Sequence, residues 1–322
     1  MNINSPFKVV ALGMLAASLI PLSNLRAQGA WTEYPNIQYG PLHASNKDAS
    51  TNLVSLDIYV PGGVTPGELL PVVFMIHGGN WNAGDKADEI VVENKAPFFT
   101  SNGCVFVSTN YELSPAIKYP VHVEDVARAI AFIYYNAEDY NIDRKNITVM
   151  GHSAGAQLAA LVSVDGKYLE QAGLSNKIIR RTILLDGVYN LPYRLKTDVE
   201  NEDADDAVAI QEAFGLNPVT LRKASPALNI KRSPLHYTPP MLDFFRGTAD
   251  KMFTDEQILQ NLAANNIPAG GIYCNGFTHK DVDWYVGLEG SEMNQPILDF
   301  LAGADPSKLS GEINITPGPP AP

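Results

Sequence analysis

The chain has 322 residues, of which 45% are hydrophobic and 18% are charged, with 25 Gly and 23 Pro. This composition supplies enough apolar side chains for a sizeable core, and it excludes wholesale disorder or a collagen-like structure. The net charge of −12 repels phosphate backbones and anionic membrane surfaces, so we expect no nucleic-acid partner.

The amino-terminal segment has the pattern of a secretory signal peptide. The single charge of Lys8 precedes an apolar run over residues 9–22, and Ala27 offers a small residue for cleavage. This run is shorter than the roughly 20 residues that span a bilayer, and no later stretch is apolar enough to span one. We therefore expect residues 1–27 to be removed and the protein to be secreted or periplasmic, with no membrane span.

From residue 53 onward the chain alternates strand-like and helix-like segments, which is typical of an α/β fold with a mostly parallel central sheet flanked by helices. Apolar runs as short as these fit strands that are buried on both faces of a sheet. Helical spacing of apolar residues marks the longer segments. The predicted strands are 53–60, 71–76, 104–109, 147–150, 182–185, 241–245 and 271–274, and the predicted helices are 121–135, 157–164 and 292–301.

Two segments depart from this alternation. Residues 191–240 are too long for an ordinary connection between core strands, so we interpret them as a cap inserted at the carboxyl edge of the sheet, with a short helix near 207–214. Residues 304–322 end in a proline-rich stretch and are predicted to be disordered. The cap contains an acidic run that is either a solvated surface or part of the mouth of a site: Asp198, Glu200, Glu202, Asp203, Asp205 and Asp206.

A G-x-S-x-G pattern stands between the predicted strand 147–150 and the predicted helix 157–164. It consists of residues 151–155, with Ser153 at its centre. In this strand–turn–helix setting the serine hydroxyl projects above the sheet, at the amino end of the following helix. Ser153 is therefore the candidate nucleophile.

A serine nucleophile needs a general base and a carboxylate that orients the base. In enzymes with this turn the acid and then the histidine follow the serine along the chain. Asp250 follows the predicted strand 241–245, and His279 follows the predicted strand 271–274, so both loops open at the same edge as Ser153. We assign His279 as base and Asp250 as acid; the alternative acids are Asp255, Asp281 and Asp283.

Residues 77–81, His-Gly-Gly-Asn-Trp, follow the buried strand 71–76. Acyl transfer needs N–H groups close to the developing oxyanion, and glycines allow the backbone to approach that closely. Gly79, Asn80 and Ala154 are the predicted donors, and Trp81 is assigned to substrate binding. Spacings typical of a zinc site are absent from the sequence, so we expect no metal and no cofactor.

These motifs together resemble the α/β-hydrolase carboxylesterases, a group that includes hormone-sensitive-lipase-like, bacterial feruloyl-esterase-like and kynurenine-formamidase-like proteins. The resemblance covers nearly the whole chain after about residue 50. Asn80 stands where the lipase-like pattern has a third glycine, and Arg246 stands where a histidine is common. The matching segments, in order, are 56–61, 77–81 with 84–86, 110–114, 151–155 and 247–250.

The resemblance implies an α/β-hydrolase fold over residues 28–303 and a serine hydrolase that cleaves small carboxylic esters through an acyl-enzyme. An amidase or formamidase with the same residues is one alternative, and a catalytically inactive binding protein on the same fold is the other. The usual strand order of this fold places Cys104 and Cys274 about five strands apart, so we predict two buried, unpaired cysteines. The sequence does not indicate an oligomeric state.

Overall fold

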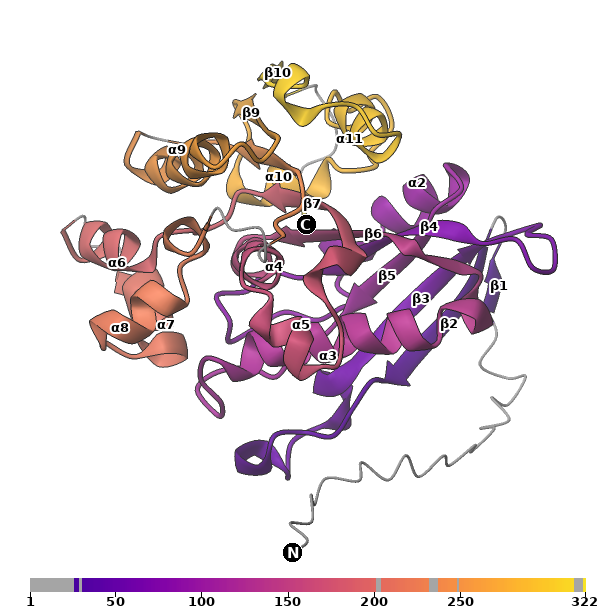
Figure 1. The fold of residues 1–322 in the computed structure, drawn as a ribbon, viewed down its shortest axis with the longest axis horizontal. Helices are drawn as coiled ribbons and strands as arrows, with labels where there is room; N and C mark the ends of the chain where they lie inside the picture. The colour runs from indigo at the N-terminus through magenta and orange to yellow at the C-terminus, as the bar shows by residue number, and fades with distance from the viewer. Residues whose placement is uncertain (1–25, 29–30, 201–203, 232–236, 248, 316–320) are drawn as a thin grey trace, which may run out of the picture.

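The structure, a computed structural model, describes residues 26–28, 31–200, 204–231, 237–247, 249–315 and 321–322. Its described part contains one ten-stranded sheet with the order β1-β2-β3-β5-β4-β6-β7-β8-β9-β10 (Figure 1). Strands β1, β2, β3 and β5 pair antiparallel, and every later pair is parallel. The strands are β1 (Arg26–Gln28), β2 (Trp31–Gln38), β3 (Ser55–Pro61), β4 (Leu70–Ile76), β5 (Val105–Thr109), β6 (Ile142–His152), β7 (Ile179–Leu185), β8 (Met241–Phe245), β9 (Ala269–Asn275) and β10 (Gly311–Asn314).

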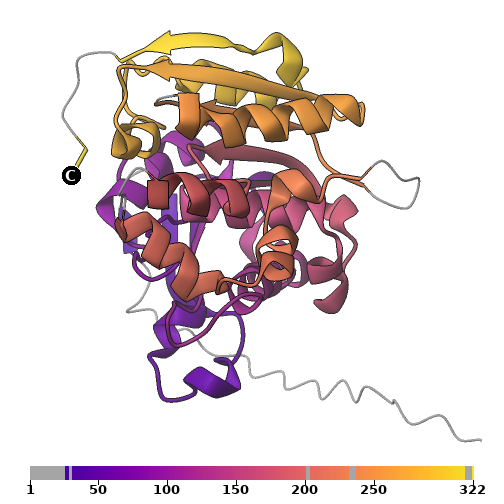
Figure 2. The same cartoon turned by 90° about the vertical axis from the view of Figure 1, so that its left-hand side faces the viewer.

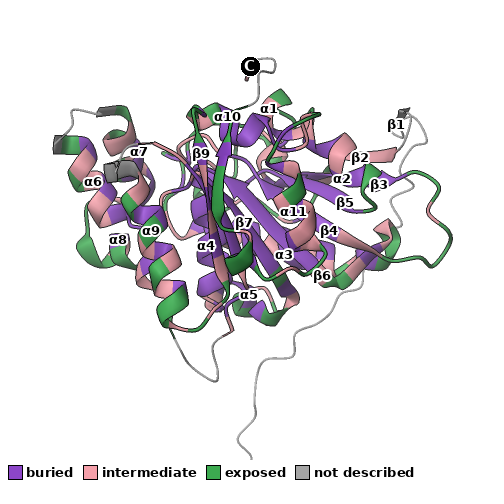
Figure 3. Cartoon of the chain, turned by 90° about the horizontal axis from the view of Figure 1, so that it is seen from above, coloured by how far each residue is buried: buried purple, intermediate pink, exposed green. Residues whose placement is uncertain are grey.

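Helices cover both faces of this sheet, so its central strands are buried (Figure 3). One face packs against α3 (Val121–Tyr135), α4 (Ala154–Val164), α5 (Lys167–Gln171) and α9 (Ala249–Ala264). The other face packs against α1 (Glu89–Val92), α2 (Lys95–Ser101), α10 (His279–Trp284) and α11 (Asn294–Leu301). The three remaining α-helices, α6 (Leu191–Glu200), α7 (Ala204–Phe214) and α8 (Pro218–Lys223), lie at one side of the sheet (Figure 1).

Strand β4 shows why these apolar runs form central strands. Its side chains alternate between the two faces, so Phe74 and Ile76 enter one apolar cluster while Val73 and Met75 enter the other. All four side chains are fully buried. The uninterrupted apolar run of the sequence therefore corresponds to a strand with a core on each side.

The predicted α/β fold with a mostly parallel sheet is confirmed, and every predicted core strand is present, with ends that differ by five residues at most from those expected. The helix predicted at 121–135 is α3, and the closing helix is α11. Cys104 and Cys274 are both buried and unpaired, as predicted. Cys104 directly precedes β5 and Cys274 lies in β9, and the four strands β4, β6, β7 and β8 separate them in the sheet. No helix in the described part is both long and apolar enough to cross a bilayer.

The expectation of a disordered tail over residues 304–322 is wrong for its first half. Residues Gly311–Asn314 form β10, which pairs parallel with β9 at the edge of the sheet. The side chain of Ile313 is buried against the sheet and Leu309 packs against the same apolar cluster, although most residues of this segment are polar or small. Residues 316–320 lie outside the described residues.

The 191–240 insertion does form a cap, built mainly from α6, α7 and α8; Figure 2 looks onto the side of the molecule where these helices lie. The short helix expected near 207–214 is α7, which begins three residues earlier. Residues 201–203 and 232–236 lie outside the described part, as do residues 1–25 of the predicted signal peptide. The remaining two residues of that peptide, Arg26 and Ala27, form most of β1.

Candidate active site

Ser153 occupies the sharp turn between β6, which ends at His152, and α4, which begins at Ala154. Its backbone has φ 54° and ψ −120°, a conformation that residues with a Cβ atom rarely adopt. The Ser153 N–H donates to the carbonyl of Leu185 at the end of the neighbouring strand β7, at 2.9 Å. The turn is thus held against the sheet while the serine side chain stands at the amino end of α4.

The two outer glycines of the pattern are required by close backbone packing. A Cβ atom on Gly151 would lie 2.2 Å from the Gly155 carbonyl oxygen, and one on Gly155 would lie 2.2 Å from the carbonyl oxygen of Ile76. Both distances are far below van der Waals contact, and the obstructing atoms are backbone atoms that cannot swing away. The G-x-S-x-G spacing therefore follows from how tightly α4 approaches β6 and β4.

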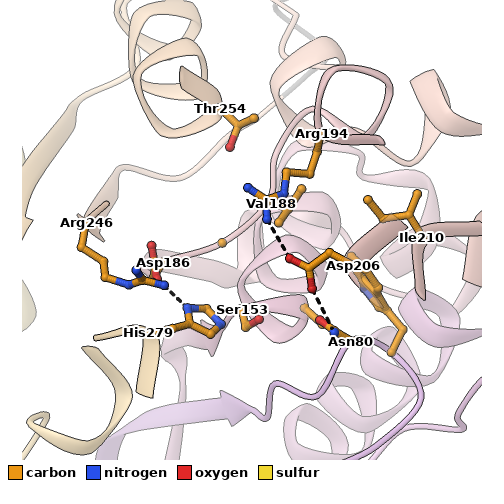
Figure 4. Close-up of a pocket in the computed structure, with 13 residues that line it drawn as sticks. Asn80, Ser153, Asp186, Val188, Arg194, Asp206, Ile210, Arg246, Thr254 and His279 are labelled. Atoms are coloured by element: carbon orange, nitrogen blue, oxygen red, sulfur yellow. Dashed lines mark hydrogen bonds and ion pairs between the residues drawn. The ribbon is translucent and has the colours of Figure 1, made fainter. Parts of the chain in front are cut away.

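His279 begins α10 and lies beside Ser153 on the wall of the same cavity (Figure 4). Its Nδ1 atom is 2.5 Å from Oδ2 of Asp186, the residue that directly follows β7. The Nε atom of Arg246 lies 2.8 Å from the same carboxylate oxygen. Burial alone would raise the pKa of Asp186, but the hydrogen bond and charge of His279, together with Arg246, hold that pKa below its ordinary value. Asp186 is therefore held as a carboxylate.

Asp186 was not among the predicted acids. The predicted acid, Asp250, lies near the start of α9, and its side chain is outside the described residues, so its assignment stays a prediction. The alternative acids have other partners: Asp281 caps α10 through Thr278, and Asp283 forms a buried ion pair with Lys95 at 2.8 Å. The third, Asp255, is fully buried, which raises its pKa well above the ordinary value.

His152, which precedes Ser153, contacts His279 at the start of α10. Its Nε2 atom donates to the backbone carbonyl of His279 at 2.9 Å, and the two imidazole centroids are 4.5 Å apart. Burial is the main reason that the pKa of His152 is lowered to about 4, so the ring is neutral near pH 7. A neutral neighbour adds no positive charge beside the His279 imidazole.

The predicted oxyanion loop follows β4 in an unusual backbone conformation. Three successive residues have positive φ: 111° at Gly79, 50° at Asn80 and 58° at Trp81. Only glycine fits at position 79, because a Cβ atom there would lie 2.2 Å from the Ala83 carbonyl oxygen. The loop thereby approaches Ser153 and Ala154, the first residue of α4, whose N–H lacks an intrahelical acceptor by helix geometry.

Trp81, assigned to substrate binding from the sequence, lies on the cavity wall but is only 3% exposed. Its indole N–H donates to Gln157 of α4 at 2.9 Å, and its ring packs edge-on against Phe214 of α7. These contacts join the oxyanion loop to the cap, and direct contact between Trp81 and a substrate stays a prediction. His77, also in this segment, is buried and stacks on Tyr111.

Ser153 and His279 open onto two cavities. The cavity beneath the cap has a volume of about 240 Å³ and is lined by polar side chains, including Arg194, Asp206 and Arg246, together with the apolar Val188 and Ile210. A second cavity of about 380 Å³ lies on the other side of the oxyanion loop, toward α1 and α10. Ser153 and His279 therefore line both cavities.

Backbone strain is concentrated at this site. Seven described non-glycine residues have positive φ, and five of them are four asparagines and Asp186, residue types that adopt this conformation readily. The other two, Trp81 and Ser153, both line the cavity beneath the cap. Such conformations cost about 1–3 kcal/mol each and persist where the surrounding structure enforces them, commonly at functional sites.

No group of three or more metal-binding side chains occurs among the described residues.

Comparison with known proteins agrees with this geometry. The family model described as BD-FAE matches residues 56–262, which is more than half of the chain. The chain belongs to the BD-FAE family. The matched segment of this BD-FAE protein contains residues 77–81, Ser153, Asp186 and the cap, while His279 lies beyond its end.

Relatives of this BD-FAE protein include an esterase and a deacetylase. Esterase LipQ of Mycobacterium tuberculosis is 34% identical over 152 residues, covering 47% of this chain and 33% of LipQ. Arylacetamide deacetylase of Bos taurus is 32% identical over 159 residues, covering 48% of this chain and 39% of that protein. The chain thus matches only a third to two fifths of the length of these two relatives.

The solved structures support the α/β-hydrolase fold of this family member. A truncated carbohydrate esterase from gut microbiota superimposes with a TM-score of 0.67 at 18% identity, covering 86% of this chain and 97% of that one. At this level of identity the likeness concerns the fold alone.

Proposed function

We propose that this protein is a serine hydrolase that cleaves carboxylic esters through an acyl-enzyme. The observation that carries the proposal is the arrangement of Ser153, His279 and Asp186. A strained serine at the amino end of α4 shares a cavity wall with an imidazole whose Nδ1 is engaged by a buried carboxylate. This is the arrangement that activates a hydroxyl nucleophile.

In the proposed reaction, Ser153 Oγ attacks the carbonyl carbon of the ester while Nε2 of His279 takes the hydroxyl proton. The N–H groups of Gly79, Asn80 and Ala154 stabilise the oxyanion of the tetrahedral intermediate. The imidazolium then gives its proton to the departing alcohol, which leaves an acyl group on Ser153. Water, deprotonated by His279, attacks this acyl group and releases the carboxylic acid.

Asp186 acts through His279. Its contact with Nδ1 requires the Nδ1–H tautomer, which leaves Nε2 free to accept the serine proton. Its carboxylate also stabilises the positive charge that the imidazole carries after the proton transfer. Arg246 pairs with the same carboxylate and keeps it ionised.

The proposal is tested by replacing the nucleophile and labelling the protein with a fluorophosphonate. The variant Ser153→Ala should lower kcat for a p-nitrophenyl ester by roughly 10⁴-fold or more and should take up no label. Ser175→Ala, at an exposed serine, is the matched control and should keep both properties. Labelling that persists in Ser153→Ala would place the nucleophile elsewhere, and an unlabelled wild type would favour the binding-protein alternative.

An amidase is the second candidate, because one of the relatives is named arylacetamide deacetylase, and an arylacetamide is an amide. The catalytic residues do not distinguish the leaving groups, since an alcohol and an amine both take their proton from the histidine. A matched ester and anilide of the same acid, such as p-nitrophenyl acetate and p-nitroacetanilide, decide between them. We expect the ester to have the larger kcat/KM.

We also propose that residues 1–27 are a signal peptide and that the mature protein is exported. Lys8 and the apolar run at 9–22 support this proposal. Cleavage after Ala27 would leave β2 as the edge strand, since it removes two of the three residues of β1. Amino-terminal sequencing of the protein recovered from outside the cytoplasm should begin at Gln28; a chain that retains its first residues would contradict export by this route.

A further inference from the structure

A carboxylate of the cap reaches the oxyanion loop. Oδ1 of Asp206, on α7, accepts a hydrogen bond from the side-chain amide of Asn80 at 3.2 Å (Figure 4). Oδ2 of the same residue accepts one from Nη2 of Arg194, on α6, at 2.7 Å. Each oxygen of this single carboxylate therefore has its own donor.

Arg194 is itself firmly held. It is 8% exposed, and its Nε atom lies 2.9 Å from Oδ1 of Asp198, one turn further along α6. This pair fixes the guanidinium, and the guanidinium fixes the Asp206 carboxylate. The cap thus presents a preset acceptor to the Asn80 amide, with little freedom left for the carboxylate to rotate.

The contact matters because of where Asn80 lies. Its backbone has φ 50°, and its N–H is one of the proposed oxyanion donors. Oxyanion donors stabilise a transition state only when their direction is fixed beforehand. The hydrogen bond from Trp81 to Gln157 anchors the residue after Asn80. The hydrogen bond from the Asn80 side chain to Asp206 anchors Asn80 itself, which carries the proposed donor N–H.

We propose that Asp206, oriented by Arg194, is a positioning residue that holds Asn80 in its oxyanion-binding conformation, so that docking of the cap completes the catalytic site. The inference rests on the proposed serine hydrolase function. A carboxylate is needed at this position because two donors converge on it. Asparagine would offer one oxygen and turn its amino group toward a second donor.

The first test compares two adjacent acids of the same helix turn. Asp206→Ala should lower kcat about tenfold and leave KM within about twofold, since the substrate is bound but its oxyanion is less well stabilised. Asp206→Asn should fall between this variant and the wild type. Asp205→Ala removes a neighbouring exposed carboxylate from the same first turn of α7 and should change neither constant.

A trifluoromethyl ketone that forms a tetrahedral adduct with the serine gives an independent measurement. Its inhibition constant should rise by the same factor as kcat/KM falls across the Asp206 variants. A structural role that only weakens folding would lower the amount of active enzyme without changing this inhibition constant. A rise in KM with unchanged kcat would instead mean that Asp206 contacts the substrate directly, and it would overturn the proposal.

The decisive experiment is a double-mutant cycle with Asn80→Gly, which removes the amide and tolerates the positive φ. If Asp206 acts through Asn80, then Asp206→Asn and Asp206→Ala have no further effect on kcat in the Asn80→Gly background. Additive losses would overturn the proposal, and the Asp206→Asn arm answers the question even where the alanine variant does not fold. Ser153→Ala, measured in the same series, separates the two failures: if it retains activity, the proposed function itself is wrong.

Discussion

The Nδ1 atom of His279 lies 2.5 Å from the carboxylate of Asp186, and these two residues come from different parts of the sheet edge. Asp186 follows β7, next to strand β6 that leads into Ser153, whereas His279 follows β9, two strands further along. Asp250, the acid expected from the chain order, follows β8. Asp186 and Asp250 thus follow neighbouring strands, and each is a candidate for the carboxylate that orients His279.

Asparagine substitutions distinguish these two acids. Asp186→Asn keeps the size of the side chain but removes the charge that fixes the Nδ1–H tautomer, so kcat should fall by about 10³-fold to 10⁴-fold. Asp250→Asn should lower kcat by less than about threefold. The measurement is kcat for one p-nitrophenyl ester, with circular dichroism to establish that both variants fold. A large loss for Asp250→Asn with a small one for Asp186→Asn would restore the assignment made from chain order.

This difference shows where the sequence is informative about the site. Ser153 could be assigned because a buried strand, a glycine-bounded turn and a helix occur in immediate succession. His279 could be proposed because a predicted strand ends shortly before it. Asp186 carried the same kind of signal, since it follows the predicted strand 182–185, but chain order alone does not rank one strand end above another. The contact of Asp186 with His279 depends on how the two strand ends are placed in the sheet, which the local sequence does not encode.

The parts of the fold that the sequence analysis missed include edge strands, several flanking helices and long-range contacts. β2 mixes polar and apolar residues without strict alternation, and β10 buries only Ile313, so neither has the uniform apolar run of a central strand. The insertion length predicted a cap, but not that Asp206 would leave the solvated acidic run to contact Asn80. Such contacts depend on how the cap helices dock rather than on local sequence.

A second prediction concerns the packing of α4 against β4. Gly155→Ala should destabilise the protein by about 3 kcal/mol or more, because its methyl group would meet the Ile76 carbonyl oxygen at 2.2 Å. Gly311→Ala is the control, since nothing lies within 4 Å of the added methyl group in the edge strand β10. Urea unfolding measures both. Equal stabilities of the two variants would contradict the close approach of the helix to the strand.

A third prediction uses the buried His122, which lies 3.0 Å from the Ser114 hydroxyl and away from the active site. Burial lowers its pKa to about 3, so between pH 6.5 and that value the unfolded chain binds a proton that the folded chain does not. This difference favours unfolding progressively as the pH falls, by about 2 kcal/mol between pH 6.5 and 4.5.

The variant His122→Gln isolates this contribution because it cannot be protonated in this range. The difference in unfolding free energy between wild type and variant should shift by about 2 kcal/mol in favour of the variant from pH 6.5 to 4.5. His43→Gln, which removes an exposed histidine, is measured in parallel as the control substitution. A pH-independent difference for His122→Gln would mean that His122 takes up its proton in the folded protein as readily as in the unfolded chain.

The last prediction concerns the charge of the substrate. The cavity beneath the cap contains two cationic and two anionic side chains in contact, Arg246 with Asp186 and Arg194 with Asp206, while Asp198 adds a further carboxylate beside Arg194. Both arginines are therefore neutralised by the protein itself, and the whole chain carries a net charge of −12. A substrate carboxylate meets no uncompensated cation here and approaches against the overall field, so kcat/KM for a neutral ester should exceed that for a matched half-ester with a free carboxylate by about tenfold. Added salt should narrow this difference in kcat/KM as the Debye length falls below about 10 Å.

The variant Asp206→Asn should narrow the difference as well, because it removes one of the two carboxylates that neutralise Arg194. An equal or higher kcat/KM for the half-ester at low salt would show instead that Arg246 or Arg194 binds the anion.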